Sequence, residues 1–359
     1  MKSSGKQREN NIELLRIIMM LGVIFLHINS VTGKALMFVE IGSINEWILY
    51  IGDYSFVCAV DTFMLISGYF LSVTNERTVY KPINLLLQVV VWAEVEYFIS
   101  IVIGKRSFSL YMLIARMIPR NYFVTLFLVV YIISPYINIL LEELEKREQL
   151  KQFVSLSFIL FSVFPFFVDI ISTVIKFDLN ALCTIGFFGS EWGYTIVNFI
   201  LLWVIGAYIR KRNIELGMKM SVVFYEIIVF IEVILAKSSS FFGKNMIDCA
   251  SAYCNPLVIL NAILLFNIFK KIKIENGIII KNFAQASMTV LLLHEYFLQM
   301  FDFESIVGKP AGQMIVWIVC IAISVYFLCF VLWKVYSVSV ERLLNFIVEY
   351  LANKKGKDK

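Results

Sequence analysis

Apolar runs of about 20 residues recur from one end of this sequence to the other. Hydrophobic residues make up 60% of its 359 residues and charged residues only 16%, a balance too apolar for an ordinary soluble domain. A run of this length lets a helix cross the hydrocarbon core of a bilayer. The sequence therefore predicts an all-α, polytopic membrane protein with about ten transmembrane helices: 12–31, 47–72, 83–104, 121–141, 152–172, 194–209, 218–236, 254–270, 282–301 and 314–336.

The basic residues between these helices indicate how the chain crosses the membrane. Segments predicted on one side, both termini included, carry roughly twice as many Lys and Arg residues as those on the other side. Because cytoplasmic loops are enriched in Lys and Arg, we expect both termini in the cytoplasm. The net charge of +5 then requires no nucleic-acid partner. Residues 105–120 leave a second interpretation open, as an interfacial or re-entrant helix, so that nine or eleven spans remain alternatives.

The same pattern defines the domain organisation. We expect a cytoplasmic tail over 1–11, one transmembrane domain over 12–336 and a basic cytoplasmic tail over 337–359, in a bacterial cytoplasmic membrane. The cysteines are scattered without metal-ligand spacing, and no metal is expected. A disulfide between Cys249 and Cys254 is an alternative to their role as apolar filler. The sequence leaves open whether the protein forms a homo-oligomer.

Arg16 and His27 lie on the first predicted helix, and His27 is one of only two histidines in the chain. Eleven residues come to within about 20° of three full turns, so both side chains leave the same face, roughly 16 Å apart along the axis. Charged and titratable groups at membrane depth are costly and mark functional sites. Two structural alternatives stand beside this: Glu13 could pair with Arg16, and His27 could contact lipid headgroups.

Further polar residues fall within the apolar runs. Asp61 precedes Ser67-Gly68-Tyr69 on the second helix, where the Ser-Gly pair serves either close helix packing or a local opening for a ligand. Glu94 and Glu96 cannot face the same way on one helix, so at least one is structural or interfacial. His294 and Glu295 lie on the ninth helix, in the same half of the membrane as His27. A hydrogen bond to a carbonyl or to Glu295 is the structural alternative for His294.

Several of these residues together resemble the acyltransferase 3 family of integral-membrane acyltransferases. The similarity rests on Ile12-Glu13-Leu14-Leu15-Arg16 followed by His27, on Asp61 with Phe63 to Leu71, and on weaker matches at 122–138, 203–211, 253–271 and 286–297. It covers nearly the whole chain. Met64 and Ile17 depart from the residues that many members carry there, phenylalanine and glycine, without removing a functional group.

The resemblance implies transfer of an acyl group, usually acetyl, from cytoplasmic acyl-CoA to a carbohydrate hydroxyl at the outer face, as in capsular polysaccharide, exopolysaccharide or a lipid-linked precursor. The family's essential arginine and histidine correspond to Arg16 and His27. Acyl-CoA is then a donor substrate, and no permanently bound cofactor is expected.

The chemistry of the residues agrees with this expectation. An imidazole accepts a proton near neutral pH, so His27 could act as general base, with Asp61 or Glu94 as the carboxylate that orients it, or it could carry the acyl group itself. A guanidinium binds phosphate bidentately, which makes Arg16 a candidate for a CoA phosphate. Arg210, Lys211 and Arg212 are further phosphate candidates, although positive-inside topology explains them equally well. The remaining auxiliary or substrate-binding candidates are Ser67, Gly68, Tyr69, His294 and Glu295.

A transporter or flippase of a lipid-linked glycan is the alternative from another class. Its helices would also carry charged residues at mid-depth and glycine-broken segments. Against it, no pair of corresponding interrupted helices marks two repeats, and the arginine-to-histidine spacing has no evident transport purpose. A polysaccharide polymerase is less favoured, because the outer connection at about 173–193 carries few arginines.

Overall fold

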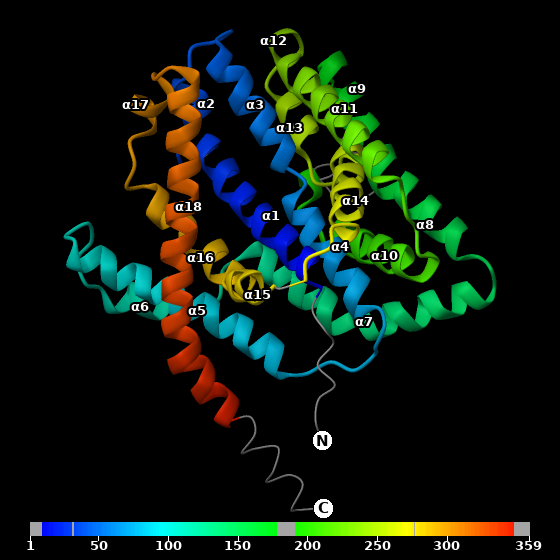
Figure 1. Ribbon diagram of the computed structural model, residues 1–359, viewed down its shortest axis with the longest axis horizontal. Coiled ribbons are helices and arrows are strands. Elements are labelled where there is room, and N and C mark those ends of the chain that lie inside the picture. The colour runs from blue at the N-terminus through cyan, green and yellow to red at the C-terminus, as the bar shows by residue number, and fades with distance from the viewer. Residues whose placement is uncertain (1–8, 31, 178–190, 276, 348–359) are drawn as a thin grey trace, which may run out of the picture.

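The computed structural model describes residues 9–30, 32–177, 191–275 and 277–347. Every regular element in these ranges is helical, as the sequence predicts (Figure 1). The α-helices are α1 (Asn10–Asn29), α2 (Ala35–Phe38), α3 (Ile44–Phe56), α4 (Ala59–Leu71), α5 (Tyr80–Val102), α6 (Leu110–Arg116), α7 (Tyr122–Lys146), α8 (Leu150–Phe158), α9 (Phe164–Ile175), α10 (Ile196–Arg212), α11 (Met218–Lys237), α12 (Ser239–Phe242), α13 (Asn245–Ser251), α14 (Pro256–Lys270), α15 (Ile278–Gln285), α16 (Ser287–Leu298), α17 (Phe303–Val307) and α18 (Ala311–Tyr336). Short π and 3₁₀ segments are η1 (Ile159–Val163), η3 (Glu191–Gly193) and η4 (Ser337–Glu341).

Helices lie at all ten predicted positions, and seven of them, among the described residues, are long and apolar enough to cross a membrane. The protein is therefore a polytopic membrane protein, while the prediction of ten spans and of cytoplasmic termini stays a prediction. Outside the seven are α10, α11 and the shorter apolar helix α16. The seven candidate spans are Asn10–Asn29, Ile44–Leu71, Tyr80–Val102, Tyr122–Lys146, Leu150–Ile175, Asn245–Lys270 and Ala311–Ile347.

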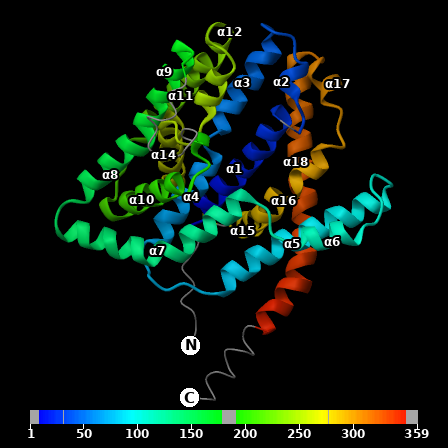
Figure 2. The same ribbon diagram turned by 180° about the vertical axis from the view of Figure 1, so that it is seen from behind.

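Helix α1 runs through the middle of the bundle in both views (Figures 1 and 2). It packs against α3, α4, α14, α15, α16 and α18, and apolar residues such as Leu15, Ile24 and Ile28 are fully buried. Side-chain amides fix its first turn, because Asn10 Nδ2 donates to the Ile274 carbonyl and Asn11 Nδ2 to the Phe269 carbonyl, each over 2.9 Å. Because other helices surround α1, polar residues on it can face protein rather than lipid.

Two glycines let α4 and α10 approach closely. A Cβ on Gly68 would collide with the backbone of Trp203, and a Cβ on Gly206 would collide with the backbone of Leu65. The Ser67 hydroxyl donates to the Phe63 carbonyl over 2.9 Å, one turn back on its own helix. The close approach at Gly68 agrees with the close-packing interpretation, since small residues bring helix backbones together in membranes. The substrate-binding role of Ser67 and Gly68 stays a prediction.

The segment between α5 and α7 is not a plain loop, because it contains the short helix α6. Arg116 of α6 forms an ion pair with Glu96 over 3.4 Å and donates to the Ala93 carbonyl over 2.8 Å. Its guanidinium also lies 5.3 Å from the centre of the Tyr97 ring. Glu96 therefore has the structural role that the sequence assigns to at least one of the two α5 glutamates.

Cysteines form no disulfide among the described residues. Cys58, Cys249 and Cys329 are buried free thiols, Cys254 is also buried, and Cys320 is exposed. The alternative of a bridge between Cys249 and Cys254 does not hold, and their burial among apolar side chains agrees with the filler role. Cys183 lies outside the described residues.

Candidate functional site

The only two histidines of the chain meet between α1 and α16. The rings of His27 and His294 stand edge to face with their centres 4.7 Å apart. His27 is eleven residues beyond Arg16 on α1, while His294 comes from the other end of the chain. The structure thus brings together two residues that the sequence placed in the same half of the membrane.

The orientation of His294 is set by its own helix. Its Nδ1 lies 2.8 Å from the carbonyl oxygen of Val290, one turn earlier on α16. A carbonyl only accepts hydrogen bonds, so Nδ1 carries the proton and Nε2 keeps its lone pair. Nε2 is buried and has no hydrogen-bond partner among the described residues. The carbonyl partner confirms part of the structural alternative for His294 and leaves the other ring nitrogen available.

Glu295 supplies the carboxylate next to His27. Its Oε1 lies 3.6 Å from His27 Nδ1, and its Oε2 accepts a hydrogen bond from the Thr32 hydroxyl over 3.2 Å. About half of the Glu295 side chain is exposed (51%), against 32% for His27. We call His27, His294 and Glu295 the histidine cluster. One ligand atom from each lies within 4.8 Å of the others, so the cluster has donors that could hold a metal ion.

Asp61 and Glu94 are not hydrogen-bonded to His27. Asp61 is fully buried on α4, and neither of its carboxylate oxygens has a hydrogen-bond partner among the described residues. The same is true of both carboxylate oxygens of Glu94, which is half-buried on α5. Depth in the membrane selects candidate carboxylates but does not show which helices pack together. The auxiliary or substrate role of these two residues stays a prediction.

Arg16 occupies the other end of the α1 face. Its Nη1 pairs with Glu13 Oε1 over 3.2 Å, as the first structural alternative expects. Glu13 is almost completely buried, whereas the Arg16 side chain is 28% exposed. The ion pair therefore buries the carboxylate of Glu13 and leaves part of the Arg16 side chain exposed.

Tyr69 and the predicted phosphate candidates lie near the end of α10. Arg210 Nη1 donates to the Tyr69 hydroxyl over 3.0 Å, and its guanidinium lies 4.8 Å from the centre of that ring. Arg212 pairs with Glu145 over 3.3 Å at a cavity of about 520 Å³. No side-chain hydrogen bond or ion pair of Lys211 is found in the part of the chain described. The lining of the cavity is completed by Glu148, Lys151 and Tyr208.

Lys270, which sequence reasoning treated only as an inner charge, belongs to the same region. Its Nζ lies 5.9 Å from the centre of the Tyr69 ring and pairs with Glu215 Oε1 over 3.0 Å. The ammonium holds the pKa of the Glu215 carboxyl below its usual value through a hydrogen bond and charge attraction. Positive charge therefore gathers around Tyr69 from α10 and α14.

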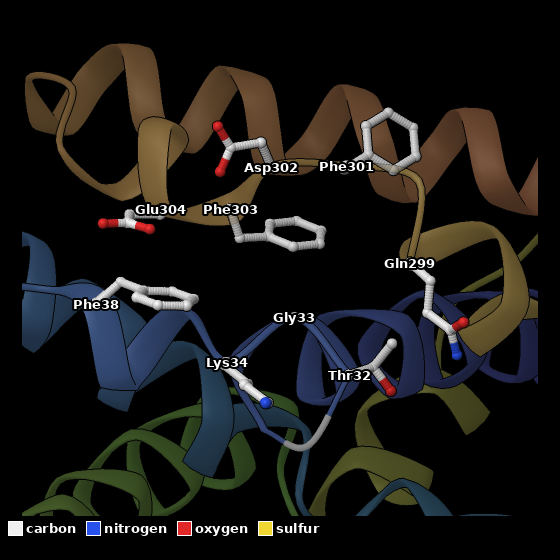
Figure 3. A pocket seen from close by; sticks show the side chains of 9 residues that line it. All are labelled: Thr32, Gly33, Lys34, Phe38, Gln299, Phe301, Asp302, Phe303 and Glu304. Carbon is white, nitrogen blue, oxygen red and sulfur yellow. The ribbon is translucent and has the colours of Figure 1, made fainter.

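A cavity of about 280 Å³ adjoins the histidine cluster. We call it the Thr32 pocket. Figure 3 shows Glu304 and Phe38 at one end and Gln299 and Thr32 at the other, with the Phe303 ring between them. Thr32 connects the pocket to the cluster through its hydrogen bond to Glu295. The remaining lining residues are Gly33, Lys34, Phe301 and Asp302.

A tight turn after α1 positions Thr32. The Gly33 amide donates to the His27 carbonyl over 2.9 Å, and a Cβ on Gly33 would collide with the backbone of Ile28. Glycine is therefore required for the chain to fold back over the end of α1. Sequence reasoning missed this pocket, since its two walls come from segments more than 260 residues apart in the chain. Gly33, six residues after His27, was the local signal.

Fold and site together describe an all-α membrane protein with a histidine and carboxylate cluster in its helix bundle. The family model described as an acyltransferase domain matches residues 9–334, and the chain therefore belongs to the acyltransferase 3 family. The resemblance seen in the sequence is confirmed, and membership makes the protein an acyltransferase rather than the alternative transporter. No curated protein and no solved structure matches the chain.

Proposed function

We propose that the protein transfers an acetyl or other short acyl group from cytoplasmic acyl-CoA to a hydroxyl of a cell-surface or lipid-linked polysaccharide. The observation that carries the proposal is the histidine cluster, built on the helix that also carries Arg16. His27 stands beside a carboxylate, which is the arrangement of a general base with an orienting group. The location that we propose is a bacterial cytoplasmic membrane, and the positive-inside pattern favours both termini on its cytoplasmic side.

In this mechanism Glu295 favours the His27 tautomer with its proton on Nδ1, leaving Nε2 as the base. The separation of 3.6 Å is longer than a hydrogen bond, and such contacts tighten when substrate is bound. Nε2 accepts the proton of the acceptor hydroxyl while the oxygen of that hydroxyl attacks the thioester carbonyl. The C–S bond breaks as the ester C–O bond forms, and the proton passes to the CoA thiolate. An acyl-histidine intermediate is the second route, in which Nε2 attacks the thioester first.

Donor and acceptor approach from opposite ends of α1. Arg16, roughly 16 Å from His27 along the axis, binds a CoA phosphate, and the pantetheine arm extends toward His27. The Arg210, Lys211 and Arg212 group binds further phosphate charge. The acceptor occupies the Thr32 pocket, whose aromatic rings and hydrogen-bonding side chains suit the apolar faces and hydroxyls of a sugar.

Transfer of radiolabelled acetyl from acetyl-CoA into surface polysaccharide by membranes that contain the protein tests this function. We expect His27→Ala to lower incorporation by about 10² to 10⁴-fold, the usual contribution of a general base. Glu143→Gln is the control, since Glu143 is an exposed residue of α7 whose ion pairs are with Lys146 and with Arg147, the residue after the helix. Full incorporation by His27→Ala, or none by the parent chain with any acyl-CoA, would contradict the proposal.

A further inference from the structure

The histidine cluster has the donor set of a transition-metal site. Two imidazoles and one carboxylate are the protein ligands of a common class of zinc site, which leaves a fourth position open. Each residue of the cluster offers one ligand atom, and these atoms lie within 4.8 Å of one another. Two ligands of one tetrahedral Zn²⁺ stand about 3.4 Å apart, given bonds of about 2.0–2.1 Å. Donor atoms that lie up to 4.8 Å apart therefore have to approach one another by up to about 1.4 Å when one ion binds all three.

The state of each donor suits a metal. His294 is 1% exposed, and its buried Nε2 has no hydrogen-bond partner among the described residues. Its Nδ1 is bonded to the Val290 carbonyl, which is the usual outer support of a metal-ligating histidine and fixes the tautomer that binds metal through Nε2. His27 Nδ1 is likewise buried and without a hydrogen-bond partner in the described part of the chain. Two imidazole nitrogens are thus left unsatisfied at one place.

Glu295 completes the set and opens it to solvent. Its Oε2 is occupied by the Thr32 hydroxyl, while Oε1 faces His27 Nδ1 at 3.6 Å. The side chain is 51% exposed, so an ion can enter without unfolding the bundle. Its outer partner Thr32 orients the carboxylate in the same way as Val290 orients His294.

We propose that His27, His294 and Glu295 bind one transition-metal dication of the Zn²⁺ class and that binding switches the transferase off. Imidazole and carboxylate donors favour Zn²⁺ and Co²⁺ over Mg²⁺ and Ca²⁺, which prefer all-oxygen sites. A metal on His27 Nδ1 takes the nitrogen that carries the proton in the proposed mechanism. The proton of the neutral ring is then on Nε2, which can no longer accept the proton of the hydroxyl. The inhibitory half of the inference rests on the proposed function, whereas the binding half does not.

The binding half is tested on the purified full chain in detergent, with an affinity tag that lacks histidine. Because the chain has only two histidines, any imidazole-to-metal signal comes from this pair. Titration with Co²⁺ is followed by visible absorption, and Zn²⁺ is then added to displace it. We expect one saturable equivalent. His294→Ala should weaken binding by at least about 10 to 100-fold, the loss that even outer supports of a metal site cause, and Glu295→Gln should also weaken it.

Two control variants separate this site from other donors at the surface. Glu304→Gln removes an exposed carboxylate of the neighbouring Thr32 pocket, and Cys320→Ser removes the exposed thiol of α18. Both should leave the Co²⁺ titration unchanged. The inference fails if the parent chain shows no saturable Co²⁺ band, if His294→Ala binds as the parent does, or if Cys320→Ser abolishes the band.

The inhibitory half is tested by acetyl transfer in the presence of Zn²⁺. We expect incorporation to fall as the site fills and to return when EDTA removes the ion. Transfer that is unaffected by a saturating Zn²⁺ concentration would overturn the inhibitory half. A chain that binds Co²⁺ but transfers no acetyl even without metal would instead contradict the proposed function, so the two failures are distinguishable.

Discussion

Among single residues, Glu295 determines how the His27 ring is held. Glu295→Gln keeps an oxygen that accepts the Thr32 hydroxyl but removes the charge next to His27. We expect kcat for acetyl transfer to fall roughly tenfold or more, because hydrogen bonds to charged groups contribute about 1.5–3 kcal/mol. KM for acyl-CoA should change little, since the residue acts on the imidazole. Steady-state kinetics of the variant beside Glu143→Gln measure this, and unchanged kcat would rule out an orienting role.

Arg16 is the second residue whose role can be tested. Substitution has different effects if it only pairs with Glu13 and if it also binds a phosphate of CoA. Arg16→Lys keeps the charge but loses the bidentate geometry that suits phosphate. We expect KM for acyl-CoA to rise roughly tenfold, about the loss of one charge-assisted hydrogen bond.

Glu13→Gln is the matched variant, since it breaks the pair of 3.2 Å and leaves the guanidinium in place. If Arg16 binds a phosphate of CoA, Glu13→Gln should lower KM for acyl-CoA or leave it unchanged. If Glu13→Gln raises KM as much as Arg16→Lys does, Arg16 serves only to pair with Glu13.

The residues of the site were predictable to different degrees. Helical periodicity places Arg16 and His27 on one face because that relation is local. The meeting of His27 with His294 depends on α1 packing against α16, a long-range contact for which one sequence holds no periodic signal. For the same reason depth alone proposed Asp61 and Glu94 as partners of His27, whereas the structure has Glu295 beside it.

Among helices, the contact of α4 with α10 carries a prediction about stability. Gly68→Ala would push a methyl group into the backbone of Trp203, and overpacking of this kind costs about 1–3 kcal/mol. We expect the thermal midpoint of the protein in detergent to fall. Gly312→Ala is the control, because nothing lies within 4 Å of a Cβ there, and it should be neutral or slightly stabilising. Equal midpoints for the two variants would show that the helices do not depend on this contact.

Helix positions were predictable from apolar runs, but breaks within them were not. The run 47–72 becomes α3 and α4 with an interruption at Val57 and Cys58, and the run 282–301 becomes α15 and α16 with an interruption at Ala286. No proline or glycine stands at either break, so no local residue signals it. Tertiary packing differs across the breaks, because besides α1 the helix α3 packs against α11 and α4 against α10, while α16 packs against α5 and α18.

For the whole molecule, the number of spans decides on which side of the membrane each connection lies. Ten spans place the connection between α10 and α11 inside and the connection between α16 and α18 outside. If only the seven long apolar helices cross, both connections change sides and the two termini lie on opposite sides. Cysteines at Glu215 and Glu304, exposed residues of these two connections, therefore distinguish the arrangements.

We expect a membrane-impermeant maleimide to label Glu304→Cys on intact cells and Glu215→Cys only after permeabilisation. The parent for both is a chain with its native cysteines replaced, checked for acetyl transfer. Lys34→Cys and Lys146→Cys are controls, since both arrangements place Lys34 outside and Lys146 inside. The reverse labelling of Glu215→Cys and Glu304→Cys would support seven spans. Seven spans would also change the cluster's setting in the membrane. His27 would still lie on a helix that crosses outward, α1, whereas His294 and Glu295 would lie on α16, which would not cross.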